Sequence, residues 1–151
     1  MARKNRYFLL CVVSGLVWAV IADQIAPSWR GSAFRGGLLS TPLVGVVAGL
    51  VYLPAYRFAV AGRVMMSLLT LYLSTLLFGL AWGVTDALQE LPGQAMRNSV
   101  EVVYQAIAAS FYGVTMTGFV LLLWPLAFFN HWLVGRLATT PPNVELEQHE
   151  H

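Results

Sequence analysis

The sequence predicts an all-α, polytopic integral membrane protein with four transmembrane helices. Of its 151 residues, 58% are hydrophobic and only 11% are charged, whereas an average soluble domain carries about 25% charged residues. So little charge is too little to cover the surface of a soluble particle of this size. Four apolar runs reach the length of about 20 residues that a spanning helix needs. The runs do not alternate between polar and apolar residues, which favours helices over barrel strands.

The first two runs predict plain spanning helices over residues 7–25 and 38–56. A basic cluster within the first six residues precedes the first run. This order is similar to that of a signal peptide, but no small-x-small cleavage site follows, so we expect a retained signal-anchor helix. The second run has a proline in its first turn and another in its last turn, where a helix tolerates proline best.

The third and fourth runs, 64–90 and 99–137, are longer than a bilayer requires. A helix over the third run would measure about 40 Å, whereas the hydrocarbon core is about 30 Å thick. We therefore expect both helices to extend beyond the outer face as a hairpin, closed by the Pro-Gly pair between them. Pro125 is the one interruption in the fourth run. In the alternative, the fourth helix ends near this proline and 126–137 lies along the cytoplasmic interface.

The distribution of basic residues predicts that both termini are cytoplasmic. Six lysines and arginines fall on the N-terminal side of the predicted membrane and three on the other side, which the positive-inside rule reads as N-in and C-in. Residues 1–137 then form a single four-helix domain, and 138–151 form a polar, acidic cytoplasmic tail. Eight arginines against one lysine, with many Ala, Gly, Val and Leu residues, favour a bacterial cytoplasmic (inner) membrane.

Glycines four residues apart predict close contacts between helices. The pairs are Gly45 with Gly49 and Gly79 with Gly83. Glycine at positions i and i+4 makes a groove in which a second backbone can approach closely. The spacing leaves open whether the second helix belongs to this chain or to another.

Charged residues near the predicted outer face form a second candidate group. They are Asp23, Asp86, Glu90, Arg97 and Glu101. We expect interface anchoring or pairing with arginines there, with a proton or cation path as the alternative. The middle of each predicted helix lacks ionisable residues, which argues against an ion-coupled transporter, because such a protein needs a charged group near the midplane.

An aromatic segment near the end of the fourth run is the third candidate. Trp124, Phe128, Phe129 and Trp132 fit an aromatic belt at the cytoplasmic interface. His131 lies among them and is the one histidine outside the tail. A neutral imidazole can ligate a haem iron or a pigment magnesium, so His131 is a candidate cofactor-binding residue.

The predicted function is that of a non-catalytic accessory or structural subunit of a larger membrane protein complex. Small size, the lack of a midplane charge, the glycine faces and the polar tail support this. A single cysteine excludes an internal disulfide and has no metal-ligand spacing around it. The net charge of +2 makes a nucleic-acid partner unexpected. The expected partners are the lipid bilayer and other membrane protein subunits. The alternatives are a small homo-oligomeric transporter or channel, and a pigment-, haem- or quinone-binding subunit that uses His131.

Overall fold

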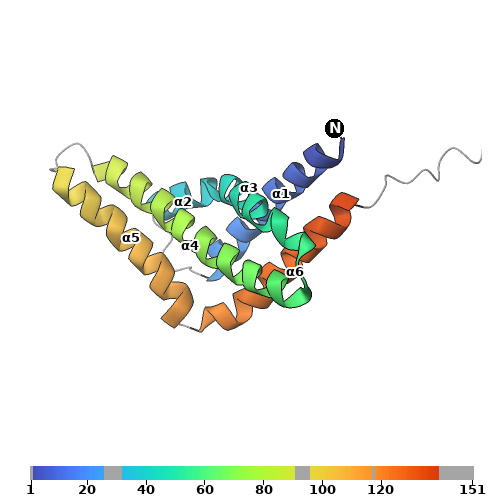
Figure 1. Ribbon diagram of the computed structural model, residues 1–151. Coiled ribbons are helices and arrows are strands. Elements are labelled where there is room, and N and C mark those ends of the chain that lie inside the picture. Colours follow the sequence, from blue (N-terminus) through green and yellow to red (C-terminus); the bar gives the residue numbers. More distant parts are fainter. Residues whose placement is uncertain (1, 26–31, 91–95, 117, 140–151) are drawn as a thin grey trace, which may run out of the picture.

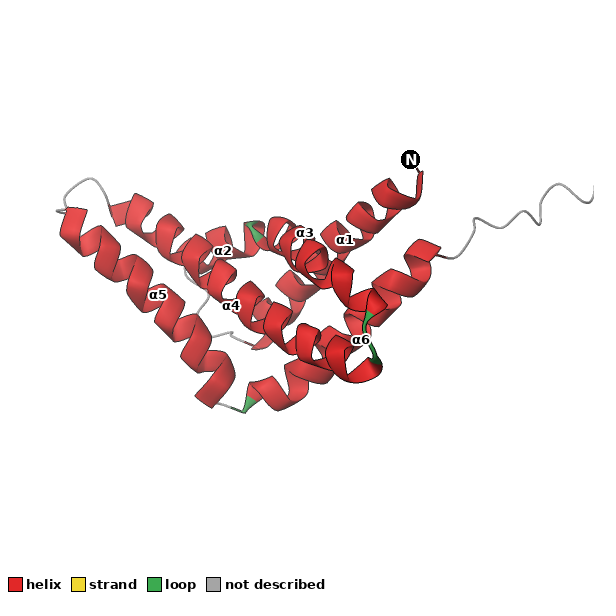
Figure 2. Cartoon of the chain, viewed as in Figure 1, coloured by secondary structure: helices red, strands yellow, loops and turns green. Residues whose placement is uncertain are grey.

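The structure, a computed structural model, describes residues 2–25, 32–90, 96–116 and 118–139. Every element in these ranges is helical, and they contain no strand (Figure 2). The all-α prediction is therefore confirmed. The elements are α1 (Ala2–Ile25), α2 (Ser32–Leu39), α3 (Thr41–Tyr52), the 3-10 helix η2 (Leu53–Arg57), α4 (Val60–Glu90), α5 (Met96–Met116) and α6 (Phe119–Thr139).

Three of the described helices are long and apolar enough to cross a membrane. The three stretches are Lys4–Gln24, Val60–Leu88 and Phe119–Ala138. The remaining expected crossing, 38–56, is divided among the end of α2, α3 and η2. With 12 residues, α3 extends over only about 18 Å. The count of four crossings and the orientation stay predictions.

The fourth predicted helix, 99–137, is two helices in the structure. The helix is interrupted before Gly118, which has φ +73°. Leu121 N–H donates to Gly118 O at 3.0 Å where α6 begins. Glycine adopts this left-handed conformation at little steric cost, which ends α5 and redirects the chain. Pro125 lies inside α6 instead of ending a helix. The expected interruption at Pro125, and the separate short helix over 126–137, are therefore replaced by a break at Gly118.

The helices form two arms around the long helix α4 (Figure 1). The second half of α4 packs against α5, and α1 packs against α6 at the end where the N-terminus lies. A buried cluster of Tyr7, Cys11, Val134 and Ala138 joins the first turns of α1 to the last turns of α6, so these two helices are antiparallel. A second cluster, Leu71, Leu123 and Ala127, joins α4 to α6 near the centre.

Glycines sit where the helices approach most closely. A Cβ added to Gly45 of α3 would lie 2.5 Å from Cys11 O of α1, and one added to Gly83 of α4 would lie 2.7 Å from Val103 Cα of α5. An added Cβ would also collide with Cys11 Sγ at Gly49 and would come 2.8 Å from Ile107 Cα at Gly79. Both glycine pairs therefore face helices of the same chain. The antiparallel α4–α5 pair has the form of the expected hairpin; its projection beyond a membrane stays a prediction.

Candidate functional site

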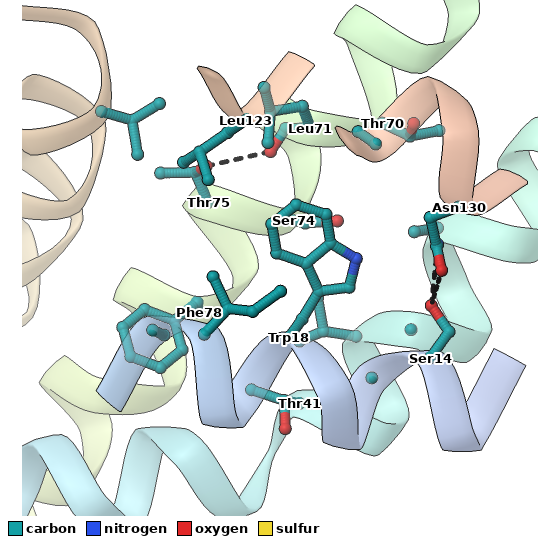
Figure 3. A pocket seen from close by; sticks show the side chains of 18 of the residues that line it. Ser14, Trp18, Thr41, Thr70, Leu71, Ser74, Thr75, Phe78, Leu123 and Asn130 are labelled. Carbon is teal, nitrogen blue, oxygen red and sulfur yellow. Dashed lines mark hydrogen bonds between the residues drawn. The ribbon is translucent and has the colours of Figure 1, made fainter. Parts of the chain in front are cut away.

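A cavity of about 390 Å³ lies among the helices, lined mainly by apolar and aromatic side chains. In Figure 3, Trp18 of α1 is seen between Phe78 of α4 and the Ser14–Asn130 pair, and all four residues line the cavity. Walls of this kind suit a hydrocarbon group. The polar side chains that line the cavity are few and uncharged: Ser14, Thr41, Thr70, Ser74, Thr75, Ser110, Asn130 and His131.

His131 is held on three sides. Its side chain is buried, and its ring stacks on Tyr52 of α3 with centroids 3.9 Å apart and planes 3° from parallel. Its Nε2 lies 2.9 Å from Thr70 Oγ1 of α4, and Tyr56 Oη donates to the His131 carbonyl oxygen at 2.7 Å. One residue of α6 is therefore tied to α3, η2 and α4 together.

The Thr70 hydroxyl has two hydrogen-bond partners. It lies 3.0 Å from Ser67 O, to which it can donate, and 2.9 Å from His131 Nε2. The tautomer of His131 decides whether the hydroxyl donates to Nε2 or accepts from it.

A tryptophan extends the same polar row along α4. Trp124 Nε1–H lies 3.1 Å from both Val64 O and Ser67 Oγ, and Ser67 Oγ donates to Val64 O at 2.7 Å. Trp124 and His131 are seven residues apart, two helical turns, and so use one face of α6. The apolar helices α4 and α6 are thus joined by a row of hydrogen bonds as well as by packing.

Ser14 and Asn130 form a reciprocal pair between α1 and α6. Ser14 Oγ donates to Asn130 Oδ1 at 3.0 Å, and Asn130 Nδ2 donates to Ser14 Oγ at 2.8 Å. Both residues line the cavity (Figure 3). Paired amide and hydroxyl groups in an apolar wall can exchange partners with a ligand that has a carbonyl or hydroxyl group.

Ser110 of α5 has no such pairing. Of the buried side-chain polar atoms in the described ranges, its Oγ alone lacks a hydrogen-bond partner. Thr75 and Thr115, in comparable helical positions, donate to the carbonyl four residues earlier. Ser110 is 6% exposed and lines the cavity. A buried hydroxyl without a partner costs about 1–3 kcal/mol, and this one lies against α4, where a Cβ added to Gly79 would be 2.8 Å from Ser110 Oγ.

Of the aromatic residues predicted to form a belt, some are partly buried between helices and others are exposed. Trp124 is half-buried in the polar row, and Phe128 lines a second pocket. Phe129 and Trp132 are exposed and stack at 5.6 Å. His131, placed by sequence reasoning among the belt residues, is instead buried at the cavity.

The predicted outer charges do not line the cavity. Asp23 of α1 and Asp86 of α4 are half-buried, and exposed Glu101 accepts from Gln105 Nε2 at 3.3 Å. The side chains of Glu90 and Arg97 lie outside the part of the chain that the structure describes. The same part holds no group of three or more side chains that could bind a metal ion.

Sequence reasoning did not single out the hydroxyl residues of α4. Ser67, Thr70 and Ser74 are spaced at i, i+3 and i+7 in an otherwise apolar helix. That spacing places them on one face, and it was the available signal for a polar row on that side.

The described residues define a class: an all-helical protein with three helices able to span a membrane and a partly open, largely apolar cavity between its helices. Comparison with protein-family profiles, curated proteins and solved structures finds no match to this chain.

Proposed function

We propose that this is a small integral membrane protein that binds one neutral, largely apolar small molecule inside its helix bundle. The observation that carries the proposal is the cavity itself, with its mainly apolar lining and its uncharged polar side chains. Ligand sites are concave, mostly apolar, and carry a few convergent polar groups, with volumes of roughly 300–1,000 Å³. The volume of about 390 Å³ and the lining fit that description.

The lining indicates the chemistry of the ligand. Among the described residues no charged side chain lines the cavity, so a charged ligand would lose its hydration without compensation. Trp18, Phe34 and Phe78 offer faces for a ring or a hydrocarbon chain. Hydroxyl, amide and imidazole groups offer hydrogen bonds to a carbonyl or hydroxyl. A quinone or another isoprenoid-like lipid with one small polar end combines both properties.

Haem and chlorophyll fit His131 less well. Its Nε2 is already hydrogen-bonded to Thr70, and one face of its ring is covered by Tyr52. A metal on Nε2 would have to displace the Thr70 bond. The stacked ring is held as a structural group, so we favour the quinone-like alternative over the metal-bearing ones.

The experiment is an extraction of the purified protein with organic solvent, followed by mass spectrometry. Ser74→Phe places a large ring at the cavity wall, whereas Leu76→Phe changes an exposed position two residues further along the same helix. We expect about one molecule of a neutral lipid per chain from the native protein and from the Leu76→Phe variant, and far less from Ser74→Phe. Equal amounts from both variants would contradict the proposal.

A different observation favours a second candidate function, that of a subunit of a larger membrane protein complex. The glycine faces are occupied within the chain, so they no longer support it. However, α5 is not among the helices apolar enough to span, yet it exposes large side chains at Val100, Tyr104, Tyr112 and Met116. Val100 and Tyr104 are four residues apart, as are Tyr112 and Met116, so each pair lies on one side of α5.

A photo-crosslinking residue placed at Tyr104 tests this surface in native membranes. Capture of one defined membrane protein is expected, with no such product from the same residue at Leu121, which is equally exposed on α6. Crosslinks only to lipid, or only to a second copy of this chain, would contradict the accessory-subunit function.

We further propose the predicted topology of four crossings with both termini in the cytoplasm of a bacterium. The start of α1, the start of α4 and the end of α6 lie at the same end of the molecule in Figure 1, which supports it. After replacing Cys11 by serine, cysteines introduced at Arg57 and at Asp86 should be labelled by a membrane-impermeant reagent from opposite sides. Labelling of both from one side would contradict this topology.

A further inference from the structure

A second pocket, of about 450 Å³, lies on the other side of the Tyr52–His131 stack. It is formed where η2 meets the start of α4 and the last turns of α6. Two arginines line it, Arg63 from α4 and Arg136 from α6. Within the part of the chain that the structure describes, none of its lining residues carries a carboxylate. The pocket is therefore basic, whereas the first cavity is uncharged.

Arg63 is held in a fixed position. Its Nε donates to Phe58 O at 3.1 Å and its Nη2 donates to Tyr56 O at 3.0 Å. These carbonyls lie at the end of η2, where a cation is favoured. The guanidinium has five N–H donors, and these bonds use two of them, so the group can still donate to an anion.

The opposite wall combines a second guanidinium with aromatic rings. Arg136 Cζ lies 5.3 Å from the centroid of the Trp132 ring. Gly135 lets the Tyr56 ring approach α6, because an added Cβ would lie 2.5 Å from Tyr56 Cε1. Two arginines bordered by tyrosine and tryptophan match the chemistry of a phosphate group at the membrane interface.

Charges and apolar surface around the pocket favour a lipid as the source of the phosphate. Asp86 lies 23 residues beyond Arg63 on α4, about 35 Å away along the helix, so it does not neutralise the site. Val60 of the lining is exposed, and exposed Phe58 and Leu133 lie within two residues of the lining in the sequence. Basic pockets between membrane helices are typical sites for anionic lipid headgroups.

We infer that this second pocket binds the phosphate headgroup of an anionic phospholipid, with the acyl chains lying on the apolar surface beside it. The inference is independent of the ligand proposed for the first cavity. It gives Arg63 and Arg136 a shared role in binding lipid, in addition to their contribution to the predicted orientation of the protein in the membrane.

Native mass spectrometry of the full-length protein tests the inference with phosphatidylglycerol and phosphatidylcholine of identical chains. We expect the native protein to retain phosphatidylglycerol over phosphatidylcholine by about five-fold or more, the effect of one arginine at a charged surface. Arg136→Gln should reduce the preference. Arg57→Gln, at an exposed arginine outside the lining, should leave it unchanged.

A second pair of variants does not depend on removing an arginine that holds the fold. Val60 lines the pocket, is exposed and is the first residue of α4, where an acidic side chain is tolerated. Val60→Glu should abolish the preference for phosphatidylglycerol and Val60→Gln should keep it. No preference in the native protein, or equal loss in both variants, would overturn the inference. Displacement of the lipid by an equal concentration of inorganic phosphate would overturn it in favour of a free-phosphate site.

Discussion

Tyr52 and His131 stack face to face at 3.9 Å, and each of them lines a different pocket. His131 lines the apolar cavity and Tyr52 lines the basic pocket. The stack is held from α4 by Thr70 and from η2 by Tyr56. The hydrogen bond between His131 and Thr70 is therefore one of the contacts that hold the stack in place, and removing it should loosen the stack.

Thr70→Val should destabilise the protein, because it leaves the buried Nε2 of His131 without its hydrogen-bond partner. The expected loss in free energy of unfolding is about 1–3 kcal/mol. Thr70→Ser keeps the hydroxyl and should retain most of the stability. Denaturant titration in detergent micelles measures both. Equal stability of the valine variant and the native protein would show that the bond to His131 contributes nothing.

Gly45→Ala should separate α1 from α3. The new Cβ would lie 2.5 Å from Cys11 O and 2.9 Å from Gly15 Cα, and backbone atoms cannot move aside without shifting a helix. Overpacking of this kind costs about 1–3 kcal/mol. Leu43→Ala, on the exposed side of the same helix, should change the unfolding free energy by about 0.5 kcal/mol or less. Similar values for the two variants would argue against a close α1–α3 contact.

Gly118→Ala tests the break between α5 and α6. An added Cβ meets nothing within 4 Å, so the cost comes from the positive φ alone and should be about 1–2 kcal/mol. Asparagine tolerates this conformation better than alanine, so Gly118→Asn should cost less. Thermal unfolding followed by circular dichroism ranks the three proteins. A rise in stability with alanine would indicate a continuous helix.

The break at Gly118 also shows a feature that could not be predicted from the sequence. An apolar run reports length and burial, so the all-α class and the three long helices could be predicted. It does not report a change of direction, because lipid and protein interior are equally apolar. Proline looked the stronger signal in 99–137, yet Pro125 is accommodated within α6 and the glycine ends α5.

The candidate site was predictable only in part, for a related reason. His131 was identified as unusual, but its environment comes from Tyr52 and Thr70, which are 79 and 61 residues away in the chain. Hydroxyl side chains such as Ser110 are compatible with either a lipid-facing or an internal position in a helix. Only the packing of α4, α5 and α6 shows that they surround one cavity.

Ser110→Ala should be neutral or stabilising in the ligand-free protein. The substitution removes a buried hydroxyl that lacks a partner, so the free energy of unfolding should stay the same or rise by up to about 1 kcal/mol. The same variant should bind the extracted lipid as tightly as the native protein, because the hydroxyl lies at the contact with Gly79 of α4. Denaturant titration before and after adding the lipid gives both values. A large loss of stability without ligand would contradict an unpaired role for Ser110.

The central claim is that a neutral lipid occupies the internal cavity, and photolabelling locates it most directly. A neutral isoprenoid probe with a photoreactive group is bound to the purified protein, irradiated, and mapped to residues by mass spectrometry. If the lipid binds in the cavity, labelling should be saturable and should fall on Trp18, Phe78 and Val114, which line the cavity. Labelling confined to outward-facing residues such as Leu9 and Leu121, without saturation, would contradict it.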